Sequence, residues 1–272
     1  MPKMLIESEL SRYQHDGVLF PVPIMPAEEI ELSLARSNEL EEYLGGKPKS
    51  TDLAQSHLHF RWAYDLATHP QLLDAVEDVL GPDLVIWSTS IFAKHARDPS
   101  YISWHQDGTY WGLDSQKVTT AWIALSDSTV ENGCMRVVAG SQRQEIQPHV
   151  DTYADRNLLS RGQEIAVEVQ EEQATDVVLK SGEMSLHHVN IIHGSNANGS
   201  DGKRVGFAIR FIAPEVRQAG QRPQAILARG RGDDNHFEFV DRPPDRSFEE
   251  AAEAMKAATR KFLESIVPQE RT

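Results

Sequence analysis

The chain has 272 residues, of which 40 % are hydrophobic and 25 % are charged, a composition typical of a globular protein. Its 41 acidic and 27 basic residues give a net charge of −14, which argues against binding to nucleic acid or to an anionic membrane surface. The charge weakly favours a cationic or zwitterionic substrate, although solubility explains it as well. A single cysteine, Cys134, excludes an internal disulfide and a cysteine-rich zinc site. No apolar run is long enough to span a bilayer or to form a signal peptide, so we expect a cytoplasmic protein.

The first third of the chain predicts helices. Leu5, Leu10 and Tyr13 recur at helical spacing, and Gly17 ends the pattern. A Pro-Ala-Glu-Glu run that begins at Pro26 opens a second helix. The predicted helices cover residues 5–16, 26–42 and 69–80, and a short strand at 18–20 follows the first of them.

From residue 83 onward the pattern changes to short apolar runs that predict strands. They are separated by turn signals such as Glu-Asn-Gly at 131–133 and Lys-Ser-Gly at 180–182. A last helix is predicted over residues 247–263, where Ser247 is a cap residue before an acidic first turn. The predicted strands cover residues 84–87, 90–94, 118–125, 135–138, 164–169, 177–179, 184–192 and 205–212.

These elements predict one mainly-β domain, a double-sheet jelly roll with helices packed outside it. Residues 141–163 and 214–246 show no clear pattern, and long loops of that kind often serve as lids or binding loops. We expect mobile lids at residues 45–60 and 150–163. The single domain over residues 1–272 divides into a helical part at about 1–82, a jelly-roll core at about 83–215, and a C-terminal extension with a helix at about 216–272.

Two short motifs hold side chains typical of a metal site. His105 and Asp107 are two residues apart, so on an extended segment both side chains lie on one face. His193 lies at the end of a later apolar run, and Arg204 follows it by eleven positions. Two imidazoles and one carboxylate make the facial triad of non-heme Fe(II) oxygenases, which leaves coordination positions open for substrates. The His-x-Asp triplet alone is a weak signal, and it is the organised set with its arginine that predicts the site.

Other residues near the motifs admit more than one role. His187 suits a structural neighbour of the metal better than a ligand. Arg210 is an alternative to Arg204 as the anchor for a carboxylate. The ring-rich segment 57–62 could approach a substrate or pack in the core, and residues 109–111 could form the floor of the substrate pocket.

In these motifs the chain resembles the phytanoyl-CoA dioxygenase family of Fe(II)/2-oxoglutarate oxygenases. The resemblance covers about residues 10–215, and the stretch 104–141 also looks like the branch that contains amino-acid-tailoring oxygenases and non-heme halogenases. It rests on the triplet His105-Gln106-Asp107, on Trp122 in Ala121-Trp122-Ile123-Ala124-Leu125, on the run Asn-Gly-Cys-Met-Arg-Val-Val-Ala-Gly-Ser at 132–141, on His193-Gly194-Ser195 and on Arg204.

The resemblance implies a double-stranded β-helix, or cupin-like jelly roll, with its metal ligands at the open mouth. It implies that Arg204 grips the distal carboxylate of 2-oxoglutarate and that Ser195 adds a hydroxyl donor to that carboxylate. Gln106 and Trp122 match family positions that line the co-substrate pocket. The implied catalytic residues, which would also bind the Fe(II), are His105, Asp107 and His193.

The resemblance also implies a reaction. Oxidative decarboxylation of 2-oxoglutarate with O₂ would drive hydroxylation of an unactivated C–H bond, or a related desaturation or cyclisation. In the halogenase branch the position of Asp107 holds Ala or Gly, so the aspartate here favours a hydroxylase. A catalytically silent cupin-like binding protein is the competing hypothesis, but a binder needs no co-substrate anchor such as Arg204.

The sequence leaves the substrate and the oligomeric state open. Nothing in it resembles a basic groove for CoA. The branch resemblance favours a small molecule, either free or tethered to a carrier protein, with no nucleic-acid or membrane partner. The candidate substrates are an amino acid, an aminophosphonate and a secondary-metabolite intermediate.

Overall fold

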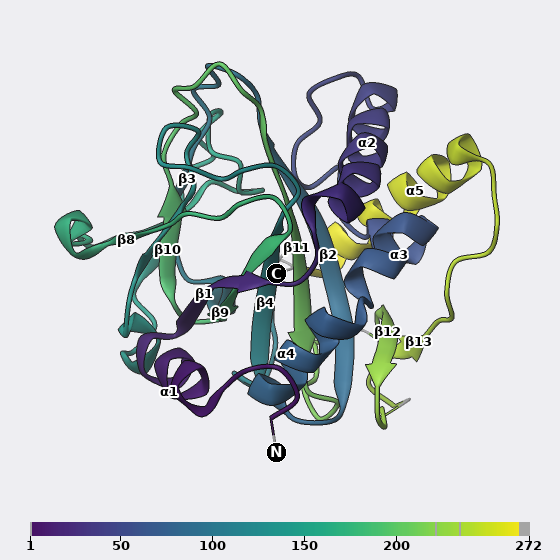
Figure 1. The fold of residues 1–272 in the computed structure, drawn as a ribbon, viewed down its shortest axis with the longest axis horizontal. Helices are drawn as coiled ribbons and strands as arrows, with labels where there is room; N and C mark the ends of the chain where they lie inside the picture. Colours follow the sequence, from purple (N-terminus) through teal and green to yellow (C-terminus); the bar gives the residue numbers. More distant parts are fainter. Residues whose placement is uncertain (1, 221, 234, 267–272) are drawn as a thin grey trace, which may run out of the picture.

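The computed structural model describes residues 2–220, 222–233 and 235–266. Its regular structure consists of many short strands and a smaller set of longer helices (Figure 1). Their bounds are β1 Val18–Pro23, β2 Leu84–Lys94, β3 Ile102–His105, β4 Val118–Ala124, β5 Met135–Val138, β6 His149–Asp151, β7 Gln163–Ile165, β8 Thr175–Val177, β9 Glu183–His188, β10 Ile192–Ser195, β11 Arg204–Ile212, β12 Gln224–Arg229 and β13 Glu238–Phe239.

The strands form two main sheets that pack face to face. The larger sheet has the order β1-β9-β4-β11-β2-β12-β13, and the smaller has the order β3-β10-β5-β8. A two-stranded ribbon, β6-β7, lies beside them. Side chains from both sheets meet in one buried cluster, in which Trp122 and Ala208 of the larger sheet accompany Met135 and Val137 of the smaller. The predicted double-sheet jelly roll is therefore confirmed.

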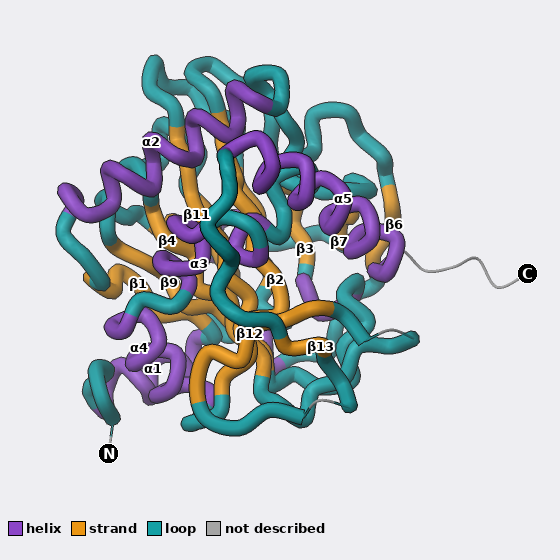
Figure 2. The backbone as a smooth tube through the Cα atoms, turned by 90° about the vertical axis from the view of Figure 1, so that its right-hand side faces the viewer, coloured by secondary structure: helices purple, strands orange, loops and turns teal. Residues whose placement is uncertain are grey.

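Helices cover the outer face of the larger sheet (Figure 2). The main apolar core lies between this face and the helices. None of the described helices is both long and apolar enough to cross a membrane. The helix bounds are α1 Glu7–Asp16, α2 Ala27–Tyr43, α3 Arg61–Ala67, α4 Pro70–Leu80 and α5 Phe248–Ile266.

Strand alternation separates the core from the interior cavity. Along β11, Phe207 and Ile209 point into the core shared with the helices. Arg204, Ala208 and Arg210 point to the opposite face and line a cavity between the sheets. One strand thus supplies both the stabilising apolar face and the charged inner face.

Several strand predictions differ from the structure. The predicted strands 164–169 and 177–179 overlap β7 and β8 by only two residues and one residue. The predicted strands 84–87 and 90–94 are one strand, β2, which pairs with β11 along nearly its whole length. The polar Ser88, Thr89 and Ser90 interrupt the apolar pattern without interrupting the backbone pairing. Conversely, the predicted strand 184–192 is two strands, because the chain passes from the larger sheet to the smaller one between β9 and β10.

The sequence pattern missed several short elements. Helix α3 falls in the ring-rich stretch, and Phe60 and Trp62 there pack with the apolar core and do not line the cavity. Strands β12 and β13 lie in a stretch predicted as a loop, where β12 extends the larger sheet beside β2. Each is short, and each depends on a distant partner that periodicity does not reveal.

A buried neutral histidine makes the fold sensitive to acid. Burial and the nearby His59 lower the pKa of His57 to about 3, and its Nδ1 lies 2.9 Å from Thr89 Oγ1. As the pH falls below about 6.5, the unfolded chain takes up a proton that the folded protein cannot accept. The stability contributed by His57 is therefore complete above that pH and is lost progressively down to about pH 3.

We expect His57 to account for about 2 kcal/mol of the stability lost between pH 7 and pH 5. Urea unfolding of the wild type and of His57→Gln at both pH values measures this. The variant should be less stable at pH 7 but should lose about 2 kcal/mol less on acidification. Equal losses in the two proteins would show that His57 is not the buried neutral group.

Candidate active site

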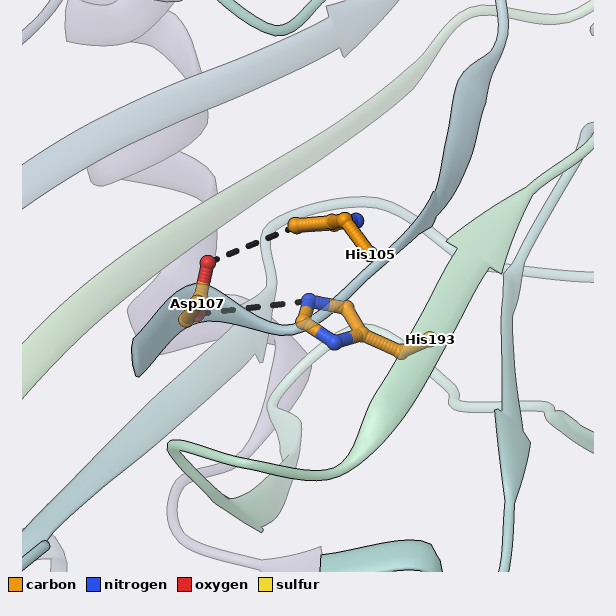
Figure 3. Close-up of side chains that lie close together, drawn as sticks. All are labelled: His105, Asp107 and His193. Carbon is orange, nitrogen blue, oxygen red and sulfur yellow. Dashed lines mark ion pairs between the residues drawn. The ribbon is translucent and has the colours of Figure 1, made fainter. Parts of the chain in front are cut away.

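The motif that holds His105 and Asp107 meets the motif that begins at His193 where β3 pairs with β10. These strands are antiparallel neighbours in the smaller sheet, and their register places His193 opposite His105. The two imidazole rings lie 4.1 Å apart between centroids. Asp107 follows β3 at the start of a single 3-10 turn, Asp107–Thr109, which turns its carboxylate back toward both rings (Figure 3).

The three side chains converge through the atoms that bind metals. His105 Nε2 lies 3.4 Å from one Asp107 oxygen, and His193 Nε2 lies 4.0 Å from the other. One potential ligand atom from each residue lies within 4.8 Å of those of the other two, and all three side chains are shielded from solvent. Two imidazole nitrogens and a carboxylate fit Fe(II) and leave further coordination positions for other ligands.

Hydrogen bonds to the main chain fix both imidazoles. His105 Nδ1 lies 2.9 Å from the carbonyl oxygen of Ser103, and His193 Nδ1 lies 3.0 Å from that of Ile191. A carbonyl only accepts, so each Nδ1 carries the hydrogen and donates it. Each Nε2 is then left with a lone pair directed at Asp107 and available to a metal.

The electrostatics of the triad also suit a metal. Burial lowers the pKa of His193 to about 3, with the neighbouring His105 acting in the same direction, so the ring stays neutral at physiological pH. Burial alone would raise the pKa of Asp107, but the adjacent His105 and the nearby His193 and Arg210 hold it below its usual range. Neutral imidazoles and an ionised carboxylate are the protonation states that coordinate a divalent cation.

The triad borders a cavity of about 350 Å³ between the two sheets. The lining includes Arg204, stacked on Trp122, and six residues further along β11 it includes Arg210, stacked on Trp111; we call these two parts the Arg204 end and the Arg210 end. Two loops also contribute to the lining, at residues 49–51 and 158–161, and the Ser50 hydroxyl donates to the Leu158 carbonyl over 2.8 Å. The two segments predicted as lids therefore meet beside the cavity, and their mobility stays a prediction.

The Arg204 end of the cavity is built to hold an anion. Arg204 is 2 % exposed, donates to the Gly133 carbonyl and stacks on the Trp122 ring at 5.0 Å. Its Nε has no partner among the described residues. Gly206 makes the stacking possible, because a Cβ there would lie 1.8 Å from the indole. Burial lowers the Arg204 pKa to about 10, so the guanidinium remains charged at neutral pH.

Lys94 is a second basic side chain next to this end of the cavity, and the sequence pattern did not single it out. It is fully buried, and its Nζ donates to Ser195 Oγ over 2.6 Å and to the carbonyls of Gly133 and Asn196. Because Lys94 Nζ donates to Ser195 Oγ, Ser195 is the acceptor of this bond and keeps its own hydroxyl hydrogen for another acceptor in the cavity. The one available signal was a lysine at the end of a largely apolar strand.

Substitution of Lys94 by Met should weaken 2-oxoglutarate binding about tenfold, the cost of one charge-assisted hydrogen bond. Burial, together with the adjacent Arg204, lowers the Lys94 pKa to about 6, and an arriving carboxylate favours the charged amine. Calorimetry on Ni(II)-loaded protein measures the affinity, and the exposed Lys117→Met serves as the matched control. An unchanged affinity in the Lys94 variant would reduce this residue to a structural role.

Three further predictions concern Gln106, His187 and the floor of the substrate pocket. Gln106 does not line the cavity. Its side chain donates to the Asn190 carbonyl and accepts from the Gln147 amide, both over 2.8 Å, and so ties the metal motif to two loops. His187 lines the cavity with its ring 5.1 Å from that of His193, but it lies outside the cluster of three potential ligands. Tyr110 and Trp111 both line the cavity, as a substrate floor requires.

A jelly roll with this triad and a buried arginine in one cavity defines the class of non-heme Fe(II)- and 2-oxoglutarate-dependent dioxygenases. The chain belongs to the phytanoyl-CoA dioxygenase family, whose model matches residues 13–206. The three residues of the triad and Arg204 all lie within that range.

Individual relatives agree with this membership. The chain is 26 % identical over 193 residues to a probable alpha-ketoglutarate-dependent hypophosphite dioxygenase of Stutzerimonas stutzeri, a match that covers 68 % of this chain and 66 % of that protein. It is 27 % identical over 169 residues to peroxisomal phytanoyl-CoA dioxygenase of Bos taurus, covering 60 % of this chain and 48 % of that protein. The matches thus span about half to two thirds of these curated relatives. Among solved structures, the non-heme monooxygenase ThoJ in its apo form aligns with a TM-score of 0.81 and 35 % identity, covering 94 % of this chain and 96 % of that one.

Proposed function

We propose that this protein is an Fe(II)- and 2-oxoglutarate-dependent hydroxylase that acts on an unactivated C–H bond of a small molecule. The observation that carries the proposal is the placement of the triad and of Arg204 in one cavity, where Lys94 holds the Ser195 hydroxyl from behind the lining. A metal site alone would also suit a binding protein. A buried cationic pocket beside the metal suits a co-substrate that carries a carboxylate, and so favours the enzyme over the silent binder.

The position of each residue in the site determines the role that we propose for it. His105, Asp107 and His193 would hold Fe(II) and leave positions for 2-oxoglutarate and O₂. Arg204 and the Ser195 hydroxyl would fix the distal carboxylate of 2-oxoglutarate, while Trp122 would limit movement at that end. When bound, the iron and 2-oxoglutarate supply the oxidising chemistry, in which O₂ and 2-oxoglutarate give succinate and CO₂ and one oxygen atom goes to the substrate.

The aspartate favours oxygen transfer over halogen transfer. Asp107 points its carboxylate at both imidazoles, so it occupies the coordination position that a halide would need (Figure 3). The names of these relatives give chemically different substrates or no substrate at all. The substrate class must therefore be inferred from the cavity of this chain. Both a free small molecule and one tethered to a carrier protein are compatible with a cavity that two loops help to line.

Succinate formation tests the proposal directly. We expect the anaerobically reconstituted Fe(II) protein to convert 2-oxoglutarate to succinate on exposure to O₂, slowly alone and faster with its substrate. The control is the same protein loaded with Zn(II), which has no redox chemistry. Tight binding of Fe(II) and 2-oxoglutarate without any succinate would support the silent binding protein.

A further inference from the structure

The cavity has the opposite electrostatic character to the protein as a whole. The chain carries a net charge of −14, yet the only acidic residue among the described cavity-lining residues is Asp107, which the triad uses. The basic residues of the lining are Lys49, Arg161, Arg204 and Arg210. Low-dielectric walls with charges of one sign concentrate ligands of the opposite sign, so this cavity selects anions.

Arg210 forms no ion pair among the described residues, and the acidic group that acts on it electrostatically is Asp107 of the triad. Its Nη1 contacts the hydroxyl groups of Ser88 and Ser90 at 3.3 and 3.0 Å, and its buried Nε has no hydrogen-bond partner. The guanidinium stacks on the Trp111 ring at 5.2 Å, which holds it in place. A guanidinium that is fixed, poorly paired and open to a cavity is suited to a carboxylate or a similar oxyanion.

Arg204 and Arg210 cannot serve one small dicarboxylate together. They are six residues apart on the same face of β11, which is about 20 Å along an extended strand. Each stacks on its own indole, Trp122 or Trp111, at its own end of the cavity. Because 2-oxoglutarate is far shorter than this separation, the end that holds Arg210 is left for a second ligand.

The Arg210 end also has the walls of a substrate pocket. Trp87 and Trp111 lie 5.3 Å apart between ring centroids, and Tyr110 carries Arg161 over its ring at 5.0 Å. A register shift between β2 and β11 beside Arg210 allows both Trp87 and Ser88 to face the cavity. The result is an apolar surface with fixed cationic groups, the usual construction of a pocket that orients a small molecule.

Resting on the hydroxylase function proposed above, we propose that the Arg210 end of the cavity binds the primary substrate and that this substrate carries a carboxylate or related oxyanion held by Arg210. The aromatic walls then receive its apolar part. The Arg204 end keeps 2-oxoglutarate, and the triad lies between the two ligands. The anionic class replaces the cationic or zwitterionic substrate that net charge alone favoured.

An anion with strong anomalous scattering tests the site without knowledge of the substrate. Crystals of the Ni(II)-loaded protein with 2-oxoglutarate are soaked in iodide, and the anomalous difference map locates the halide. We expect iodide at the Arg210 guanidinium and 2-oxoglutarate at Arg204 in the wild type. The iodide peak should disappear in Arg210→Gln and persist in Arg210→Lys, which keeps a cation.

The outcomes separate this proposal from the one on which it rests. If 2-oxoglutarate is bound but no iodide lies at Arg210, the substrate proposal is wrong and the oxygenase stands. If Arg210→Gln weakens 2-oxoglutarate binding more than about twofold, the change expected for independent sites, Arg210 serves the co-substrate and the proposal is also wrong. If the wild type binds no 2-oxoglutarate at the metal, both proposals fail.

A matched set of compounds extends the test to organic substrates. Small aliphatic and aromatic carboxylic acids are compared with their primary amides for their ability to accelerate 2-oxoglutarate consumption. We expect acceleration by acids alone, and loss of it in Arg210→Gln. An amide or an amine that accelerates consumption as well as the acid does would contradict an anionic substrate.

Discussion

Replacement of His193 by Ala should abolish iron-dependent consumption of 2-oxoglutarate and leave the protein folded. The substitution removes one of three protein ligands, which should cost more than the roughly 10–100-fold lost when only an outer-sphere partner is removed. His193 lines the cavity and belongs to none of the three apolar core clusters, so the fold should tolerate its loss. Iron content, succinate yield and thermal unfolding should be measured on the same preparation.

The matched control is His187→Gln. Its ring lies beside that of His193, and it lines the same cavity, yet no ligand atom of His187 joins the group formed by the triad. The control protein should retain iron, while His193→Ala should not. If His193→Ala consumes 2-oxoglutarate at the wild-type rate, the assignment of the triad is wrong, and loss of iron only in the His187 variant would move the ligand to that residue.

The sequence singled out the three residues that the structure brings together as potential metal ligands, because the signals were local. His105 and Asp107 are neighbours on one extended segment, and His193 and Arg204 lie in recognisable strand contexts. The jelly roll followed from short apolar runs and turn residues. The register that places His193 opposite His105 joins segments almost ninety positions apart, and no periodicity encodes it.

The same limit explains what the sequence missed. Lys94 reaches Ser195 only because β2 pairs with β11 and places Lys94 opposite Arg204. Gln106 sits inside the metal motif, but alternation turns its side chain away from the cavity and toward Asn190. Net charge gives no guidance to the cavity, since it sums the solvent-facing acidic residues and says nothing of the few side chains that line the interior.

Replacement of Arg204 by Ala should weaken 2-oxoglutarate binding by about ten- to a hundredfold. The loss corresponds to roughly 1.5–3 kcal/mol, the usual contribution of a hydrogen bond to a charged group. The variant leaves Lys94 as the remaining cation beside Ser195, so binding should be weakened without being eliminated. Calorimetry with Ni(II)-loaded protein measures the affinity independently of catalysis.

A second 2-oxo acid shows which end of the co-substrate Arg204 holds. 2-Oxobutyrate keeps the groups that reach the metal but lacks the distal carboxylate, so Arg204→Ala should bind it as well as the wild type does. The double variant Arg204→Ala/Lys94→Met should lose more affinity for 2-oxoglutarate than either single variant, because Arg204 would bind the distal carboxylate directly and Lys94 holds the Ser195 hydroxyl that would donate to it. Arg210→Gln is the control, since it removes a guanidinium from the other end of the same strand. If that control loses the affinity and Arg204→Ala keeps it, the two arginines have exchanged roles, and the end of the cavity assigned to the substrate would be the one that holds 2-oxoglutarate.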